Sequence, residues 1–298
     1  MNDVIRTQSL AMRFGRHQVL SGLDLSVARG SIYALIGSNG AGKTTTLKIL
    51  LRLIHGFHGH AEILGVPSGR IGPREYQRIG YVSENQELPD AMTVAQMLAY
   101  WRPFYQGWDV ERQRELTGMF RLPLDRKLRH CSRGVRMKAA LASALAYRPE
   151  LLILDEPFSG LDPLVRDELS EALLSQAGES TVLISSHDLA EIENFASHVG
   201  YLDEGRLQFS EEMPALAARF REVEVTLEQA VLPAQLPPTW LRTEAAPSMV
   251  RFVETAWDPD RTQADLNRVF PQAREVAVRA MPLRSIFVTL AKAAREAA

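Results

Sequence analysis

A glycine-rich loop between two regular segments has the residue types that bind phosphate. The segment LIGSNGAGKTTTLKIL, residues 35–50, contains the pattern G-x-x-x-x-G-K-[ST] from Gly37 to Thr44. Glycines let main-chain N–H groups approach an anion closely, and the helix that follows such a loop points its positive end at the same place. Lys43 can reach the β- and γ-phosphates of a nucleotide, and the Thr44 hydroxyl can ligate the Mg²⁺ that bridges them. This spacing predicts a nucleoside triphosphate site.

The segments on either side of the loop fit that site. SIYALIG, residues 31–37, predicts a buried strand, and KTTTLKILLRLI, residues 43–54, has apolar residues at helical spacing. A phosphate loop needs this strand–loop–helix setting. The alternative, a glycine-rich turn that binds no ligand, does not need it. The context therefore favours the phosphate loop.

Polar residues follow two further apolar runs. LLILDEP, residues 151–157, predicts a buried parallel strand that ends in Asp155 and Glu156, and STVLISSHD, residues 180–188, leads to His187. An acidic pair or a lone histidine at a strand end is more often solvated or structural, but the phosphate loop upstream favours a functional interpretation. Phosphoryl transfer needs a carboxylate on Mg²⁺ and a group that orients the attacking water, and we assign these tasks to Asp155 and Glu156. His187 is a candidate γ-phosphate contact.

Composition excludes some classes of protein. The 298 residues are 46% hydrophobic and 23% charged, with 34 Lys and Arg against 36 Asp and Glu. The lack of a basic surplus argues against nucleic acid as the main partner. The apolar runs are shorter than a membrane span and the first ten residues lack a signal-peptide core, so we expect the chain not to cross a membrane itself.

The order of elements predicts two domains. Residues 1–215 alternate strands and helices in an α/β pattern, with a helical insertion at about 84–135, and residues 216–298 predict a small C-terminal α+β domain in the order β-β-α-β-α. Five aromatic residues crowd the insertion, where they can pack a core or line a surface groove: Tyr100, Trp101, Phe104, Tyr105 and Trp108.

In their order, these motifs resemble those of the nucleotide-binding subunits of ATP-binding cassette (ABC) transporters, over about residues 4–210. The resemblance implies a P-loop NTPase cassette with a RecA-like core, a β-rich N-terminal part and a helical insertion. It implies ATP and Mg²⁺ as cofactors, Glu156 and His187 as catalytic residues, and Thr44, Glu84 and Asp155 as metal ligands. It implies an ATP-binding set made up of Phe14, Ser38, Asn39, Gly40, Ala41, Gly42, Lys43, Thr44, Thr45, Ser132, Gly134 and Asp162.

By the resemblance, Phe14 would stack on adenine, at a position where the family usually has Tyr. Other roles depend on a second subunit, and Asp162 would communicate across a dimer. Ser132 and Gly134 belong to the signature, which is L-S-G-G-Q in the family and CSRGV, residues 131–135, here. They would meet the γ-phosphate bound by the opposite subunit. Arg133 could add a charge to that contact or point away as a surface residue.

A second departure lies at IGYVSENQ, residues 79–86. Glu84 occupies the position of a family glutamine that reaches Mg²⁺, and a carboxylate can do the same. Gln86 is a weaker candidate for that role.

The resemblance also implies partners. They are a second copy or a homologous cassette subunit, and an integral membrane permease. FYQGWD, SRG and SGLDP together look like cassettes that energise two-component exporters, which implies a cytoplasmic subunit held peripherally on the inner face of the membrane. Two alternatives are a soluble ABC-type ATPase acting on ribosomes or DNA, and a catalytically quiet nucleotide-gated regulatory module. A GTPase is disfavoured because no N-K-x-D string is present.

Overall fold

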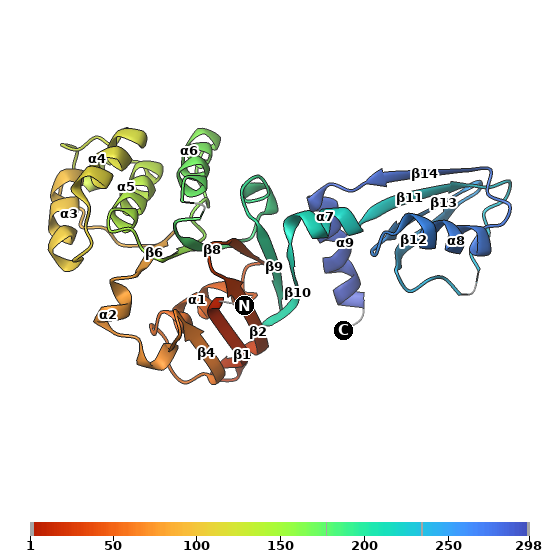
Figure 1. The fold of residues 1–298 in the computed structure, drawn as a ribbon, viewed down its shortest axis with the longest axis horizontal. Helices are drawn as coiled ribbons and strands as arrows, with labels where there is room; N and C mark the ends of the chain where they lie inside the picture. Colours follow the sequence, from red (N-terminus) through yellow and green to blue (C-terminus); the bar gives the residue numbers. More distant parts are fainter. Residues whose placement is uncertain (1–2, 177, 234, 297–298) are drawn as a thin grey trace. The chain divides into compact units, whose positions relative to one another are not determined.

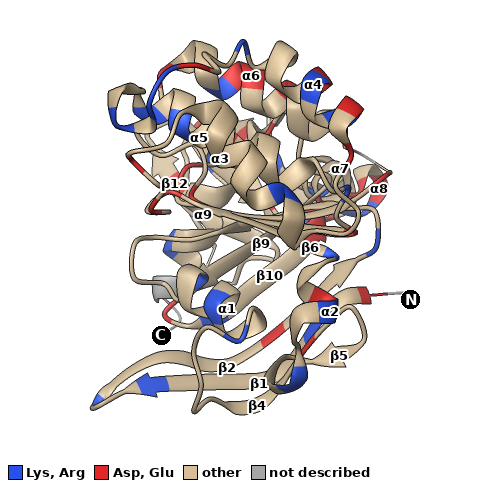
Figure 2. Cartoon of the chain, turned by 90° about the vertical axis from the view of Figure 1, so that its left-hand side faces the viewer, with Lys and Arg blue, Asp and Glu red and all other residues tan. Residues whose placement is uncertain are grey.

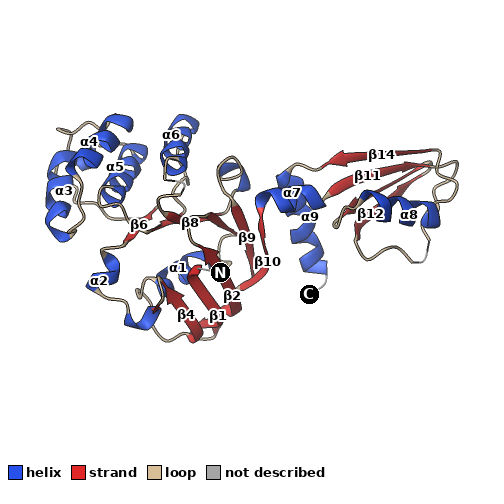
Figure 3. Ribbon diagram, viewed as in Figure 1, coloured by secondary structure: helices blue, strands red, loops and turns tan. Residues whose placement is uncertain are grey.

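A computed structural model describes residues 3–176, 178–233 and 235–296, which fall into two units, Met1–Ser210 and Glu211–Ala298. The first unit is built around a six-stranded sheet in the order β10-β9-β3-β8-β7-β6 (Figures 1 and 3). The strands are β3 (Ile32–Ile36), β6 (Ile79–Ser83), β7 (Leu151–Asp155), β8 (Thr181–Ser186), β9 (His198–Asp203) and β10 (Arg206–Glu212).

The middle of this sheet is parallel and buried. β3 pairs with β8 and β9, and β7 pairs with β6 and β8, all in parallel register. Every residue of β3, β7 and β8 is buried, which explains why their sequences are continuous apolar runs and not alternating ones. Because parallel strands end at the same edge, the residues that follow β3, β6, β7 and β8 gather along one side of the sheet.

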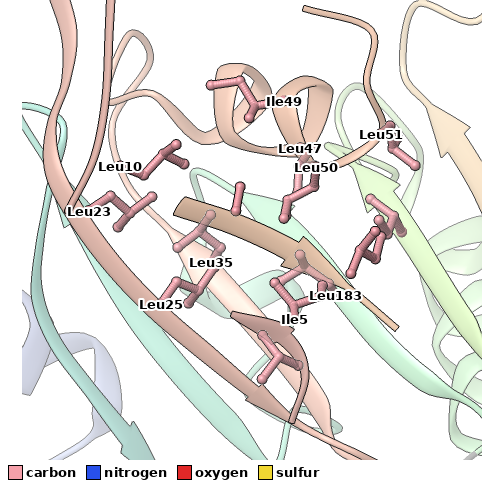
Figure 4. Close-up of a cluster of buried hydrophobic side chains, with 14 of the residues drawn as sticks. Ile5, Leu10, Leu23, Leu25, Leu35, Leu47, Ile49, Leu50, Leu51 and Leu183 are labelled. Atoms are coloured by element: carbon pink, nitrogen blue, oxygen red, sulfur yellow. The ribbon is translucent and has the colours of Figure 1, made fainter. Parts of the chain in front are cut away.

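The β-rich N-terminal part forms a second sheet, which is antiparallel and has the strand order β2-β1-β4-β5. Its strands are β1 (Asp3–Phe14), β2 (His17–Ala28), β4 (His58–Ile63) and β5 (Val66–Pro67). Leucine and isoleucine side chains from β1 and β2 meet those of β3, β8 and helix α1 (Lys43–Leu50) in one core (Figure 4). Burial of each such side chain contributes about 1.5–3 kcal/mol, so the core holds α1 and the loop before it against both sheets.

The helical insertion lies between β6 and β7. Helices α3, α4 and α5 group together at the β6 end of the sheet (Figure 1). The helices of the first unit are α1, α2 (Pro73–Tyr76), α3 (Val94–Trp101), α4 (Val110–Met119), α5 (Arg133–Leu145) and α6 (Pro163–Leu174). Short 3-10 turns occur at Ser68–Arg70, Arg102–Phe104, Leu128–His130 and Leu189–Glu191. Figure 2 shows acidic and basic positions interspersed on α4 and α6, as expected of solvated helix faces.

The aromatic residues of the insertion divide between half-buried and exposed positions. α3 ends at Trp101, and Pro103 lies in the turn that follows. Tyr105 is turned inward and stacks on Tyr147 with ring centroids 3.9 Å apart. Tyr100 and Phe104 stay exposed, at 48% and 55%.

The second unit contains a four-stranded antiparallel sheet in the order β12-β13-β11-β14. Its core includes Trp240 and Phe252, whose rings stack 3.8 Å apart, and the buried Glu254 accepts a hydrogen bond from Trp240 Nε1 at 2.9 Å. The elements are α7 (Met213–Arg219), β11 (Arg221–Thr226), β12 (Trp240–Ala246), β13 (Met249–Glu254), α8 (Pro259–Val269), β14 (Glu275–Ala280) and α9 (Leu283–Glu296). Strand β12 is one more than the expected β-β-α-β-α order. Its sequence, WLRTEAA, lacks the apolar–polar alternation that would have predicted a strand, and a register shift with a left-handed Arg242 (φ 51°) interrupts its pairing. Within the described residues of both units, no helix is long and apolar enough to cross a bilayer.

Candidate nucleotide-binding site

The phosphate loop runs from the end of β3 into the first turn of α1, as predicted. Gly40 and Gly42 adopt left-handed backbone angles (φ 86° and 108°). A Cβ on Gly42 would come within 2.6 Å of Leu20 Cδ2, so this position requires glycine. The loop residues Ser38–Thr45 line a cavity of about 430 Å³ together with Phe14, His17, Val19, Glu84 and Glu156. This volume is in the usual range for small-molecule sites.

Lys43 is the charged centre of the loop. Its side chain is 5% exposed, and Nζ donates hydrogen bonds to the carbonyl oxygens of Gly37 (2.6 Å) and Ser38 (3.2 Å). Nζ also lies 3.1 Å from Glu156 Oε1. A buried ammonium needs such partners, and a bound phosphate can replace the carboxylate among them.

Oxygen atoms of the types that bind a divalent cation lie around the start of α1. Thr44 Oγ1 donates to Asp155 Oδ1 at 2.9 Å, and Ser185 Oγ donates to the same oxygen at 2.6 Å. Glu84, which follows β6, lines the same cavity. A hydroxyl and two carboxylates are the hard oxygen donors that Mg²⁺ prefers, so the residues present fit that ion.

Glu156 is held between Lys43 and His187. Its carboxylate contacts Lys43 through Oε1 and accepts a hydrogen bond from His187 Nδ1 through Oε2 at 2.7 Å. Its backbone is left-handed (φ 52°), and its N–H donates to Ser185 Oγ at 3.0 Å. Left-handed angles in residues other than glycine are costly and often occur at functional sites. Here the angle turns Glu156 into the cavity while Asp155 stays in the strand.

The hydrogen bond to Glu156 raises the pKa of His187 above its usual value, against the opposing effect of burial. The imidazolium form therefore persists to higher pH. We expect Glu156→Gln to lower the pKa of His187, because the neutral amide no longer stabilises the charged ring. NMR titration of His187 in nucleotide-free protein measures this shift. Glu150→Gln, at the opposite end of β7, should leave the titration unchanged, and an identical midpoint in the Glu156→Gln protein would disprove the pairing.

The signature residues lie apart from this cavity. Ser132 caps α5, where its Oγ accepts a hydrogen bond from Val135 N at 3.3 Å, and Asp162 caps α6 in the same way. A Cβ on Gly134 would lie 3.1 Å from Val165, so glycine allows α5 and α6 to pack closely there. The structure thus joins the phosphate loop to Asp155, Glu156 and His187 but not to Ser132, Gly134 or Asp162.

Arg133 forms a contact within its own chain that neither of the two alternatives from the sequence included. Its Nη2 donates to Glu84 Oε1 of the same chain, and Ser159 Oγ donates to that oxygen at 2.9 Å. Burial alone would raise the pKa of Glu84, but these two hydrogen bonds, together with the charges of Arg133 and His187, outweigh it and lower the pKa below its usual value. Gln86 lies outside the phosphate cavity, and its Oε1 is buried with no hydrogen-bond partner among the described residues.

Sequence reasoning missed three residues of the site. Ser185 supports both acidic residues, and only its place in the same strand-end motif as His187 could have indicated this. His17 and Val19 line the cavity because the tight β1–β2 turn returns the chain beside Phe14. Such a turn is visible in the sequence as Gly15-Arg16 between two strand patterns.

The strand–loop–helix cradle and the acidic strand end define a P-loop nucleotide-binding cassette. A model of the ABC transporter family matches residues 20–159. The chain is 36% identical over 218 residues to an uncharacterised ABC transporter ATP-binding protein of Synechocystis, covering 70% of this chain and 61% of that one. It is 34% identical over 212 residues to the bacitracin transport ATP-binding protein of Enterococcus faecalis, covering 70% of this chain and 68% of that one.

A solved structure of an ATP-binding subunit of an ABC transporter is also similar. It superimposes with a TM-score of 0.66 at 29% identity over 72% of this chain and 92% of that one. The chain therefore belongs to the ABC transporter family, among its ATP-binding proteins. The P-loop cassette fold expected from the sequence is confirmed.

Proposed function

We propose that the protein is an ATP-hydrolysing subunit that dimerises around two ATP molecules and drives a separate membrane permease. The contact set Lys43–Glu156–His187 at the phosphate cavity carries this proposal, because it joins a phosphate-binding cation to a carboxylate able to orient water. The cassette would be residues 1–215, and residues 216–298 would be an accessory domain.

The side chains around the cavity have separate tasks in this proposal. Phe14 stacks on adenine, and the loop N–H groups and Lys43 bind the phosphates. Thr44, Asp155 and Glu84 hold Mg²⁺, which when bound neutralises charge on the phosphates. Glu156 orients the attacking water and takes its proton, while His187 contacts the γ-phosphate.

The arrangement of the remaining site residues supports a dimer. Ser132, Gly134 and Asp162 do not line the chain's own phosphate cavity. A second chain that turns these residues toward the cavity would complete the site with the N-terminus of α5. The partner is a second copy or a homologous cassette subunit.

A permease partner and export are supported more indirectly. The Enterococcus faecalis relative is named for bacitracin transport. The exposed Tyr100 and Phe104 offer an apolar surface on the insertion to a cytoplasmic helix of a permease. The subunit would then lie on the inner face of the membrane, held there by the permease.

Co-expression with a membrane permease encoded by a neighbouring gene of the source genome, once identified there, tests the proposal. We expect the chain to co-purify with that membrane protein and to hydrolyse ATP faster in its presence. Association with ribosomes or nucleic acid in place of the permease would favour a soluble cassette ATPase. Lack of hydrolysis with the permease present would favour a nucleotide-gated regulatory module.

A further inference from the structure

Two residues on different elements depart from the family patterns and contact each other. Glu84 follows β6 and adds a negative charge where the pattern has glutamine, and Arg133 begins α5 and adds a positive charge where the signature has glycine. In the structure their side chains form an ion pair. The positive charge of Arg133 thus offsets the negative charge of Glu84.

The surrounding contacts fix both side chains. Glu84 N donates to Asp155 O at 2.9 Å, and Ser159 Oγ holds Glu84 Oε1 at 2.9 Å. The Arg133 guanidinium lies over Gly160, where a Cβ would come within 2.9 Å of Nη1. Gly160 has φ 66°, and so it is favoured there both by its backbone angle and by the space that the arginine occupies.

Stability alone does not account for this pair. The Arg133 side chain is 46% exposed, and exposed ion pairs contribute only about 0–1 kcal/mol to folding. Glu84, however, lines the phosphate cavity, so an uncompensated carboxylate there would repel a triphosphate. The ion pair therefore affects the binding of the ligand, because Arg133 offsets the negative charge that Glu84 places beside the cavity.

We propose that Arg133 is a positioning residue for Glu84 of the same chain. It neutralises that carboxylate and holds it beside the phosphate cavity until nucleotide and Mg²⁺ bind. This inference rests on the proposed function, since it requires a triphosphate in the cavity. It gives the altered signature a task within one chain, in addition to any task across a dimer.

The test is a double-mutant cycle on full-length protein, read out as the affinity for a fluorescent ATP analogue in EDTA and again in Mg²⁺. In EDTA we expect Arg133→Ala to weaken binding roughly two- to tenfold, the effect of one unscreened charge near the phosphates. Glu84→Gln should bind at least as tightly as the wild type. The double variant should match Glu84→Gln within about twofold, because Arg133 has no charge left to offset. In Mg²⁺ the defect of Arg133→Ala should shrink, because the cation offsets the Glu84 charge.

Two further variants separate charge from structure. Arg133→Lys keeps the charge and should bind like the wild type. Arg136 lies on the same helix as Arg133 and forms an ion pair with Asp90 (2.5 Å). Arg136→Gln removes that ion pair, and it should leave the affinity for the analogue in EDTA unchanged even if it lowers the melting temperature. Equal losses for Arg133→Ala with and without Glu84→Gln would overturn the inference while leaving the proposed function intact. A wild-type chain that binds the analogue in neither buffer would overturn both.

Discussion

Glu156→Gln is expected to lower the rate of ATP hydrolysis by about a hundredfold or more while ATP still binds. Loss of a positioned general base costs about 10²–10⁴ in rate. The glutamine keeps the size of the side chain and can still accept a hydrogen bond, so the cavity around Lys43 and His187 should persist. Steady-state hydrolysis and the affinity for a fluorescent ATP analogue, measured on the same preparation, separate the two effects.

This substitution should also change the oligomeric state. If ATP is bound between two chains and is no longer cleaved, the Glu156→Gln protein should accumulate as a dimer on size exclusion with ATP and Mg²⁺, and remain monomeric with ADP. An elution volume that ATP does not change would contradict the dimer. Unchanged hydrolysis would remove Glu156 from the mechanism.

Glu150→Gln is the matched control, because Glu150 precedes the opposite end of the same strand and does not line the phosphate cavity. Arg78 and Arg29 bind its carboxylate, and the Arg78 hydrogen bond lowers the pKa of Glu150 to about 2. The side chains of Glu150 and of both arginines are substantially exposed, so the variant should lose little stability. It should hydrolyse ATP at the wild-type rate.

Local patterns predicted the phosphate loop because a strand, three glycines and a helix follow each other within twenty residues. The acidic pair and His187 were predictable as strand-end residues, since parallel strands bring their ends to one edge. Their mutual contacts, such as the 2.7 Å hydrogen bond between His187 and Glu156, depend on side-chain positions that a motif does not specify.

Contacts between distant elements were harder to predict. Arg133 and Glu84 are 49 positions apart, and nothing in either local pattern indicates that they form a pair. The sequence left open whether the aromatic residues of the insertion pack a core or line a groove. The structure separates them, because the helix ends at Trp101 and Tyr105 turns to stack on Tyr147. Residue patterns predict the secondary structure of a single segment, whereas these contacts depend on how several segments pack together.

The largest loss of nucleotide affinity is expected for Lys43→Ala. Lys43 is the cation of the phosphate loop, and charge-assisted hydrogen bonds to phosphate contribute about 1.5–3 kcal/mol each. Removal of the ammonium should weaken ATP binding about a hundredfold. Lys48→Ala, on the same helix but outside the cavity, is the control and should bind ATP normally.

The same substitution should destabilise the fold, because it removes the Lys43 donor from the Gly37 carbonyl oxygen and one of two donors from the Ser38 carbonyl oxygen, which keeps Ala41 N. It also removes one cation from the largely buried Glu156. Glu156→Gln in the Lys43→Ala background removes the uncompensated carboxylate. We therefore expect the double variant to recover part of the melting temperature but none of the ATP affinity. Recovery of both would mean that Lys43→Ala acts through stability alone. Normal ATP affinity in a folded Lys43→Ala protein would show that the loop binds phosphate without its lysine, and the assignment of Lys43 would then be wrong.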